Sequence, residues 1–116
     1  MAWSEKLADR IRERLAELPR VQEKVMMGGL VFMYKSKMCM GVVQDEMMCR
    51  IDPEQYESAL EKTGCHAMTM GSKVMHGYVL VDDSGTKSKK DFEYWINLCL
   101  EFNKKAKASK KKKTLK

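Results

Sequence analysis

Apolar residues near the N-terminus recur with the period of a helix. They lie four, four and three positions apart, with charged residues between them, and are Leu7, Ile11, Leu15 and Leu18. This spacing predicts an amphipathic helix that buries one stripe of side chains. Ser4 is a suitable N-cap for it, and Pro19 predicts its end because proline cannot continue the helix.

From Lys24 onward the period of the apolar residues falls toward two. The segment is rich in Val, Met, Phe and Tyr, which favour strands. Three strands are predicted, over residues 25–34, 38–44 and 47–51. Tight loops at Lys35–Lys37 and Asp45–Glu46 join them as hairpins.

The pairing of these strands predicts two apolar faces. Phe32 is placed opposite Met40, and the turn at 45–46 places Val42 opposite Cys49. The predicted core face comprises Leu30, Phe32, Tyr34, Met38, Met40, Val42, Cys49 and Ile51. The other face comprises Val31, Met33, Cys39, Gly41, Val43, Met48 and Arg50. Cys39 and Cys49 are therefore expected to point apart, without a disulfide or a shared metal ion.

The second half of the chain predicts a short helix and another hairpin. Asp52 caps the helix, Pro53 occupies its first position, and Gly64 lies beyond its last turn. Strands are predicted over 66–70 and 74–81, with a turn at Gly71–Ser72 and then the loop DDSGT.

A C-terminal helix is predicted after Ser88, which forms a capping box with Asp91. Its apolar stripe comprises Phe92, Trp95, Ile96, Cys99 and Phe102. At 116 residues and 44% hydrophobic, the chain can bury one modest core. We therefore expect a single α+β domain of order α-β-β-β-α-β-β-α, an antiparallel sheet with helices packed on it.

The Met-rich and Gly-rich segment 24–43 raises two chemical alternatives. A phosphate loop at Gly28–Gly29 should lead into a helix, whereas this pair leads into strand residues and suits a bulge or a close backbone approach. Soft ligands for Cu(I) occur in MCM at 38–40, CHAMTM at 65–70 and Met75–His76. Alternation along a strand separates Cys39 from its two Met neighbours, so we predict architecture here, with no metal or cofactor.

The net charge of +6 comes from the end of the chain. Residues 104–116 hold 8 of the 22 basic side chains and no acid, which leaves 14 basic against 16 acidic side chains, a net charge of −2, in the domain over 1–103. The lysines are Lys104, Lys105, Lys107, Lys110, Lys111, Lys112, Lys113 and Lys116. Such a tail is expected to be disordered, and either solubilises the domain or binds nucleic acid weakly through phosphates.

The cysteines and histidines do not predict a reactive site. Four cysteines without a C-x-x-C pair are expected to be small buried residues in a reducing compartment. His66 and His76 are expected at the surface or at a strand edge, and Asp82–Asp83 suits a turn beside Gly85. No apolar run reaches the roughly 20 residues of a membrane span, and charges begin at Glu5, so a cytoplasmic protein without catalytic residues is expected.

Three blocks carry a family resemblance. MMGGLVFMYKSKMCMGVV at 26–43, RIDPEQYESAL at 50–60 and VMHGYVLVD at 74–82 resemble, in this order, the N-terminal domain of the TfoX/Sxy proteins, bacterial regulators of natural competence. The resemblance implies an α+β domain of the secretion-chaperone-like group and offers no catalytic residues. The full-length regulators carry a further C-terminal domain, in whose place this chain has lysines.

Two functions follow as hypotheses. The first is a non-enzymatic regulatory module that acts through protein partners or self-association, on the second sheet face. Its candidate surface comprises Val31, Met33, Val43, Met48 and Arg50. The alternative is weak, sequence-blind binding of nucleic acid by the lysine tail.

Overall fold

The two long helices begin at the residues that the sequence marks as caps. α1 (Glu5–Arg14) follows Ser4, whose hydroxyl accepts a hydrogen bond from the backbone N–H three residues on, at 3.2 Å. α4 (Lys89–Asn103) follows Ser88, whose hydroxyl accepts the equivalent bond at 3.1 Å. Each hydroxyl satisfies an N–H group that has no partner within the first turn. The helix predicted to run up to Pro19 is shorter than expected, because the chain leaves it after Arg14.

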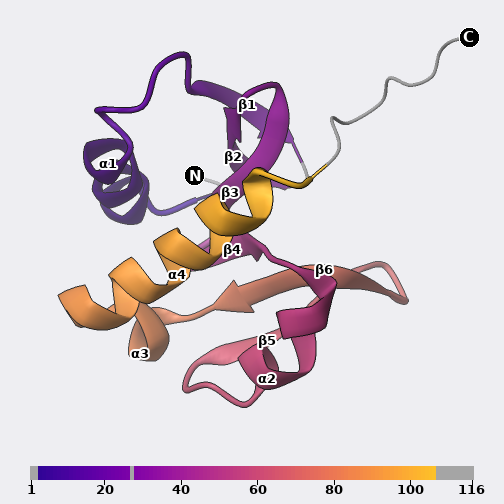
Figure 1. Ribbon diagram of the computed structural model, residues 1–116. Coiled ribbons are helices and arrows are strands. Elements are labelled where there is room, and N and C mark those ends of the chain that lie inside the picture. Colours follow the sequence, from indigo (N-terminus) through magenta and orange to yellow (C-terminus); the bar gives the residue numbers. More distant parts are fainter. Residues whose placement is uncertain (1–2, 27, 107–116) are drawn as a thin grey trace, which may run out of the picture.

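The computed structural model describes residues 3–26 and 28–106. Its strands form one antiparallel sheet in the order β1-β2-β3-β4-β6-β5 (Figure 1). They are β1 (Gln22–Met26), β2 (Gly29–Tyr34), β3 (Lys37–Val43), β4 (Glu46–Arg50), β5 (Cys65–Met70) and β6 (Lys73–Val81). A 3₁₀ turn (Pro53–Gln55) leads into α2 (Tyr56–Leu60), and α3 (Asp83–Thr86) occupies the predicted DDSGT loop. The predicted single α+β domain with an antiparallel sheet is confirmed.

The predicted strand over 25–34 is wrong, because this segment is divided between two strands. Met26 pairs with Gly29, so the chain reverses direction between them. Gly28 has a φ of +77°, which glycine adopts at little cost. A Cβ at Gly29 would overlap the backbone carbonyl oxygen of Val42, so the close approach expected of the glycine pair is confirmed there.

A bulge between β2 and β3 changes the predicted alternation. Phe32 pairs with Met40 as expected, but Met33 then pairs with Met38, so Cys39 is an extra residue on β3. Cys39 consequently belongs to the main core and not to the second face. The prediction that it points away from Cys49 is wrong, since both belong to the same buried cluster.

The turn between β3 and β4 lies one residue earlier than predicted, at Gln44–Asp45. Met40 therefore pairs with Cys49, and Val42 pairs with Met47. The register differs by two positions from the predicted one, and a shift of two leaves every side chain on the same face. Cys49 accordingly keeps its predicted place in the core, and is 0% exposed.

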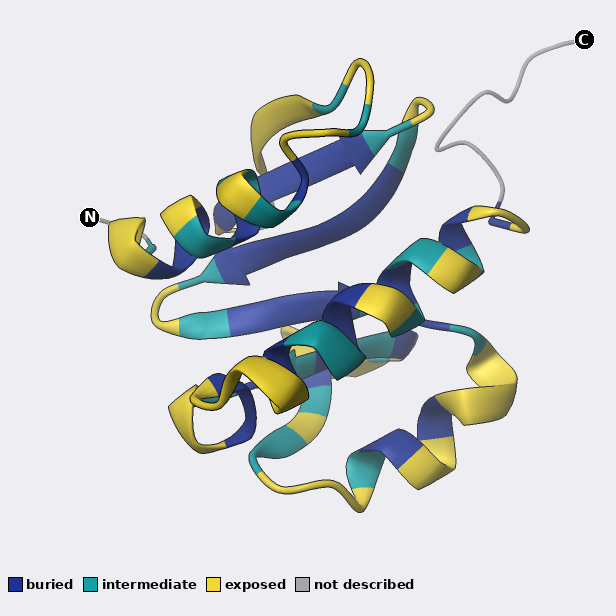
Figure 2. Cartoon of the chain, turned by 60° about the vertical axis from the view of Figure 1, so that its left-hand side comes forward, coloured by how far each residue is buried: buried dark blue, intermediate teal, exposed yellow. Residues whose placement is uncertain are grey.

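The main core lies between one face of the sheet and the helices α1, α2 and α4. Figure 2 shows the buried positions of these helices turned toward the strands. Trp95 is 1% exposed, and its indole Nε1 donates a hydrogen bond to the Gly85 carbonyl oxygen at 3.2 Å. The largest side chain of the core is thereby buried with its N–H group hydrogen-bonded, and this bond connects α4 to α3.

The opposite face of the sheet carries a second cluster, whose members in the described part of the chain all belong to strands. This strand-only cluster comprises Val31, Met33, Met38, Met48 and Met68, with the partly buried Val43, Tyr78 and Leu80 packed against it. Unbranched methionine side chains fill irregular space well, which suits a sheet face without a helix. The Met-rich segment is thus distributed over two packed faces.

Three of the four free thiols lie in the main core. Cys39, Cys49 and Cys99 are buried, and Cys39 Sγ lies 3.9 Å from the Cys99 carbonyl oxygen. Burial raises the pKa of the Cys39 thiol, and burial followed by hydrogen bonding with Cys49 raises that of Cys99. Burial also raises the pKa of the half-buried Cys65 to about 11. The thiols of Cys39, Cys65 and Cys99 therefore stay protonated at neutral pH, which makes them poor nucleophiles.

Candidate functional site

The candidate partner surface on the second sheet face is largely closed. Val31, Met33 and Met48 are 1%, 6% and 0% exposed, as members of the strand-only cluster. Val43 is half-buried at the rim of that cluster. The centre of this face is therefore occupied by packing within the chain, and a partner would meet only its rim.

Arg50, the one charged residue of this surface, is held by its own chain. Its guanidinium donates a hydrogen bond to the Met38 carbonyl oxygen at 3.3 Å. The same group lies 5.8 Å from the ring centroid of Tyr78 and 5.6 Å from that of Phe102. These contacts explain how an arginine is accommodated on an apolar face, because aromatic rings attract a guanidinium.

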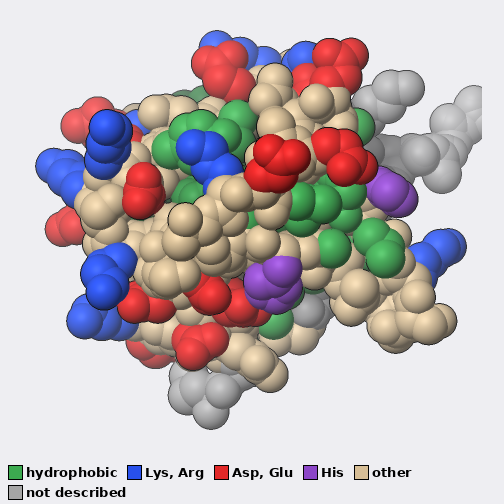
Figure 3. Space-filling model, turned by 90° about the horizontal axis from the view of Figure 1, so that it is seen from below, with side chains coloured by type: hydrophobic (Ala, Val, Ile, Leu, Met, Phe, Trp, Pro, Cys, Tyr) green, Lys and Arg blue, Asp and Glu red, His purple; other side chains and the backbone are tan. Residues whose placement is uncertain are grey.

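The two histidines do not converge on a common site. Figure 3 shows the side of the molecule that carries both, where hydrophobic side chains lie among acidic ones and the histidines are apart. His66 Nε2 lies 2.7 Å from a carboxylate oxygen of Glu46, and the His76 ring packs against Tyr56 at 5.2 Å between centroids. Within residues 3–26 and 28–106, no group of three His, Cys, Asp or Glu side chains is placed to hold a metal ion.

Asp82 acts as a cap in the structure. Its carboxylate accepts hydrogen bonds from the Ser84 hydroxyl at 2.6 Å and the Ser84 backbone N–H at 2.9 Å. The hydroxyl contact is the main reason why the pKa of Asp82 lies below its usual range. The residue thereby begins α3, in agreement with a turn role.

The C-terminal lysines divide into two groups. Lys104 and Lys105 are exposed at the end of α4, and Lys105 Nζ lies 2.5 Å from a carboxylate oxygen of Asp52. This contact lowers the pKa of Asp52, and the next residue, Ala106, is buried. Lys107, Lys110, Lys111, Lys112, Lys113 and Lys116 lie outside the described residues.

The end of α4 is bonded to the turn between β2 and β3. Asn103 is 2% exposed, and its Nδ2 donates a hydrogen bond to the Tyr34 carbonyl oxygen at 3.2 Å. Lys37 Nζ donates in return to the Asn103 carbonyl oxygen at 2.6 Å. A cation at the C-terminal end of a helix also complements the helix dipole. The lysine segment therefore starts beside this turn.

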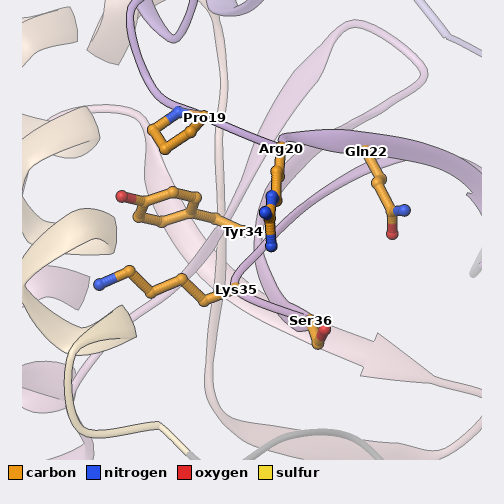
Figure 4. A pocket seen from close by; sticks show the side chains of 6 residues that line it. All are labelled: Pro19, Arg20, Gln22, Tyr34, Lys35 and Ser36. Atoms are coloured by element: carbon orange, nitrogen blue, oxygen red, sulfur yellow. The ribbon is translucent and has the colours of Figure 1, made fainter.

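A pocket of about 460 Å³ opens on the other side of Tyr34. One wall is the connection from α1 to β1, with Pro19 and Arg20, and the other is the β2–β3 turn. Figure 4 shows the Tyr34 ring between Pro19 and Lys35, with the Arg20 side chain directed alongside them. Gln22 and Ser36 complete the lining, which includes no acidic residue.

Three residues that line this pocket have a backbone conformation that favours glycine. Arg20, Lys35 and Ser36 have φ values of 59°, 56° and 64°, and Gln44 is the one other non-glycine residue of the described chain with a positive φ. Each such residue costs on the order of 1 kcal/mol or more. Among the described contacts, moreover, neither Arg20 nor Lys35 forms an ion pair, whereas Arg12, Arg14 and Lys105 do.

Sequence reasoning missed this pocket. Its two walls are about 15 residues apart along the chain, and neither carries a motif. One signal was available, since a two-residue hairpin turn favours Asn and Gly and this one has Lys35 and Ser36. A turn that lacks its preferred residues indicates that a requirement other than turn stability determines the residues there.

Comparison with known proteins gives one match. A family model described as the TfoX N-terminal domain matches residues 13–103, which include all six strands and α4. No curated protein and no solved structure matches the chain. None of the helices in the described part of the chain has the length and apolar content that a membrane crossing requires. The match covers most of the sequence and agrees with the resemblance of its three blocks, so the chain belongs to the TfoX N-terminal domain family.

Proposed function

We propose that this domain is a non-enzymatic binding module that holds nucleic acid weakly and without sequence preference, through the lysines that follow α4. The observation that carries the proposal is the bonding of Asn103 to the β2–β3 turn. It fixes the start of the lysine segment beside Lys35 and Lys37. A strand held by the segment thus passes close to cations of the domain itself.

The distribution of charge supports the same function. Residues 1–103 carry a net charge of −2, so the domain alone has no general attraction for phosphates. Six lysines within residues 107–116 supply it, because each lysine that neutralises a phosphate releases counterions. The described histidines and thiols have partners that suit structural roles, which supports binding rather than catalysis.

The proposal is tested by titrating the full chain into a fluorescent single strand of about 20 nucleotides, at about 50 mM and about 200 mM salt. Replacing the six lysines of residues 107–116 by glutamine should reduce the affinity at the lower salt concentration by at least about tenfold. The slope of log affinity against log salt should fall by up to about 4, at about 0.7 per lost phosphate contact.

The matched control replaces the same six lysines by arginine, which keeps the charge. Affinity close to that of the unchanged protein is expected, since the binding is electrostatic. Equal affinities of the glutamine variant and the unchanged protein would refute the proposal. A marked preference among strands of different sequence would refute its second part.

A second candidate function is self-association at the edge of the sheet. All five residues of β1 are exposed, with Val25 at 72% and Met26 at 36%, and within the described residues β1 pairs with β2 alone. An edge strand with free backbone groups and apolar side chains is a template for a strand of a second copy. This surface replaces the largely buried residues of the original protein-partner hypothesis.

Sedimentation measurements over a range of protein concentrations test this candidate. The unchanged protein should shift from monomer to dimer as its concentration rises. The double variant Val25→Lys, Met26→Lys should remain monomeric, since added edge charges oppose strand pairing. The variant Lys73→Gln, which lies on β6 and outside β1, is the control. A monomer at every concentration would exclude self-association.

A further inference from the structure

The pocket beside Tyr34 has the components of a nucleotide site. We infer that it binds one unpaired nucleotide of a single-stranded nucleic acid, an inference that rests on the nucleic-acid function proposed above. The pocket volume of about 460 Å³ lies within the range of about 300–1,000 Å³ that is typical of ligand sites. It is the described cavity that adjoins the start of the lysine segment, because Tyr34 contributes its ring to the pocket and its carbonyl oxygen to Asn103.

The charges of the pocket fit a phosphodiester. Arg20 and Lys35 are the cations of its lining, and no carboxylate neutralises them there. The planar guanidinium of Arg20 suits bidentate hydrogen bonding to phosphate oxygens, and the ammonium group of Lys35 acts as a second positive point charge. The lining thus carries one cation on each wall, and the Lys35 Nζ lies 5.4 Å from the centroid of the Tyr34 ring.

The uncharged lining fits the rest of a nucleotide. Tyr34 and Pro19 supply flat apolar surface for a base or sugar, and aromatic rings bind any base because every base has a π face. The Gln22 amide and the Ser36 hydroxyl supply hydrogen-bonding groups without a fixed pattern. In a duplex the bases are already stacked and paired, so the pocket favours a single strand over a duplex.

The backbone conformation of the residues that line the pocket indicates that its two cations have a role other than stabilising the fold. Lys35 and Ser36 have φ values of 56° and 64° in a hairpin turn where Asn and Gly fit without strain. Arg20, on the facing wall, has a φ of 59°. Strained residues that share one pocket are typical of ligand sites.

The strain makes a sharp test available. In the double variant Arg20→Asn, Lys35→Asn, both charges are lost, while asparagine tolerates the positive φ. The melting temperature should stay equal or rise. The affinity of the full chain for a single strand of about 20 nucleotides at about 50 mM salt should fall about tenfold, and its affinity for a duplex of equal length should fall less.

Two controls isolate the pocket from general charge. Gln44→Gly relieves a positive φ of 54° at a residue that does not line the pocket and keeps both cations, so its affinity should match that of the unchanged protein. The pair Lys73→Gln, Lys24→Gln removes two exposed cations that do not line the pocket, and should weaken single-strand binding by less than about twofold.

A further titration with adenosine monophosphate distinguishes the binding of a free nucleotide from the binding of a strand. The monophosphate should bind much more weakly than the strand and should shift the NMR signals of the Tyr34 ring. Monophosphate affinity equal to that of the strand would overturn the assignment to a strand. Unchanged single-strand affinity in the Asn double variant, or no shift at Tyr34, would overturn the site itself. If the Asn double variant keeps its affinity while the lysine-to-glutamine variant loses affinity, the site is refuted and the proposed function stands. If the Asn double variant loses affinity while the lysine-to-glutamine variant keeps it, the proposed function alone is contradicted.

Discussion

Replacing Cys49 by aspartate is expected to destabilise the domain by more than about 4 kcal/mol at pH 8. Cys49 is 0% exposed and lies on β4 against Met40, within a cluster of apolar side chains. A carboxylate there would lose its hydration without gaining a cationic partner. Since a domain of this size is stable by about 5–15 kcal/mol, much of the variant should be unfolded in mild denaturant.

The pH dependence of the variant identifies the cause. Burial raises the folded-state pKa of the introduced aspartate above its unfolded value of about 3.9. The destabilisation is therefore complete above the folded-state pKa and is relieved as the pH falls through it. Urea unfolding should show the Asp variant recovering stability from pH 8 toward pH 5.

Cys49→Ala is the matched control, since it removes the sulfur without adding charge. It should cost about 1–2 kcal/mol, with little difference between the two pH values. An Asp variant as stable as the unchanged protein at pH 8 would mean that residue 49 is accessible to water, against the observed core.

Replacing Gly29 by alanine is expected to cost about 3 kcal/mol, the upper end of the range for overpacking. The added Cβ would overlap the carbonyl oxygen of Val42, which is backbone and cannot rotate away. Relief requires β2 and β3 to separate where Leu30 pairs with Val42, inside the sheet. The measurement is the denaturant midpoint, with amide exchange of the Leu30 and Val42 N–H groups.

Gly28→Asn separates crowding from backbone conformation. A Cβ at Gly28 meets nothing within 4 Å, and asparagine adopts the left-handed conformation more readily than most residues. The expected cost is below about 1 kcal/mol. Equal costs at both glycines would show that the close approach of Gly29 to β3 does not limit stability.

The helix N-caps and one hairpin turn, which depend on neighbours along the chain, were predicted correctly. The N-caps Ser4, Ser88 and Asp52 were identified because a cap needs only its own side chain and the next few N–H groups. The turn at Gly71–Ser72 was found for the same reason. The division of residues 22–34 into two strands was missed, because a period of two continues across a hairpin and does not reveal where the chain reverses.

Features that depend on contact between distant segments were not predicted. The bulge at Cys39 is a property of the pairing of β3 with β2, and it moved a thiol from one face to the other. The burial of Met33 and Met48 was missed because the packing of methionines across several strands leaves no periodic signal. The pocket escaped for the same reason, since Arg20 and Lys35 meet only when the α1–β1 connection lies against the β2–β3 turn.

The sequence by itself determined the fold class, the family, the capped helices and the segregation of charge into the last 13 residues, because composition and local spacing suffice for these. The tertiary structure decided which sheet face the helices cover, which cysteines share the core, and where the lysine segment begins in space. The physical reason is that packing and strand register are selected by the summed fit of many distant side chains. The bond from Asn103 to the Tyr34 carbonyl joins residues 69 positions apart, and it places the end of α4 beside a residue that lines the pocket we assign to a nucleotide.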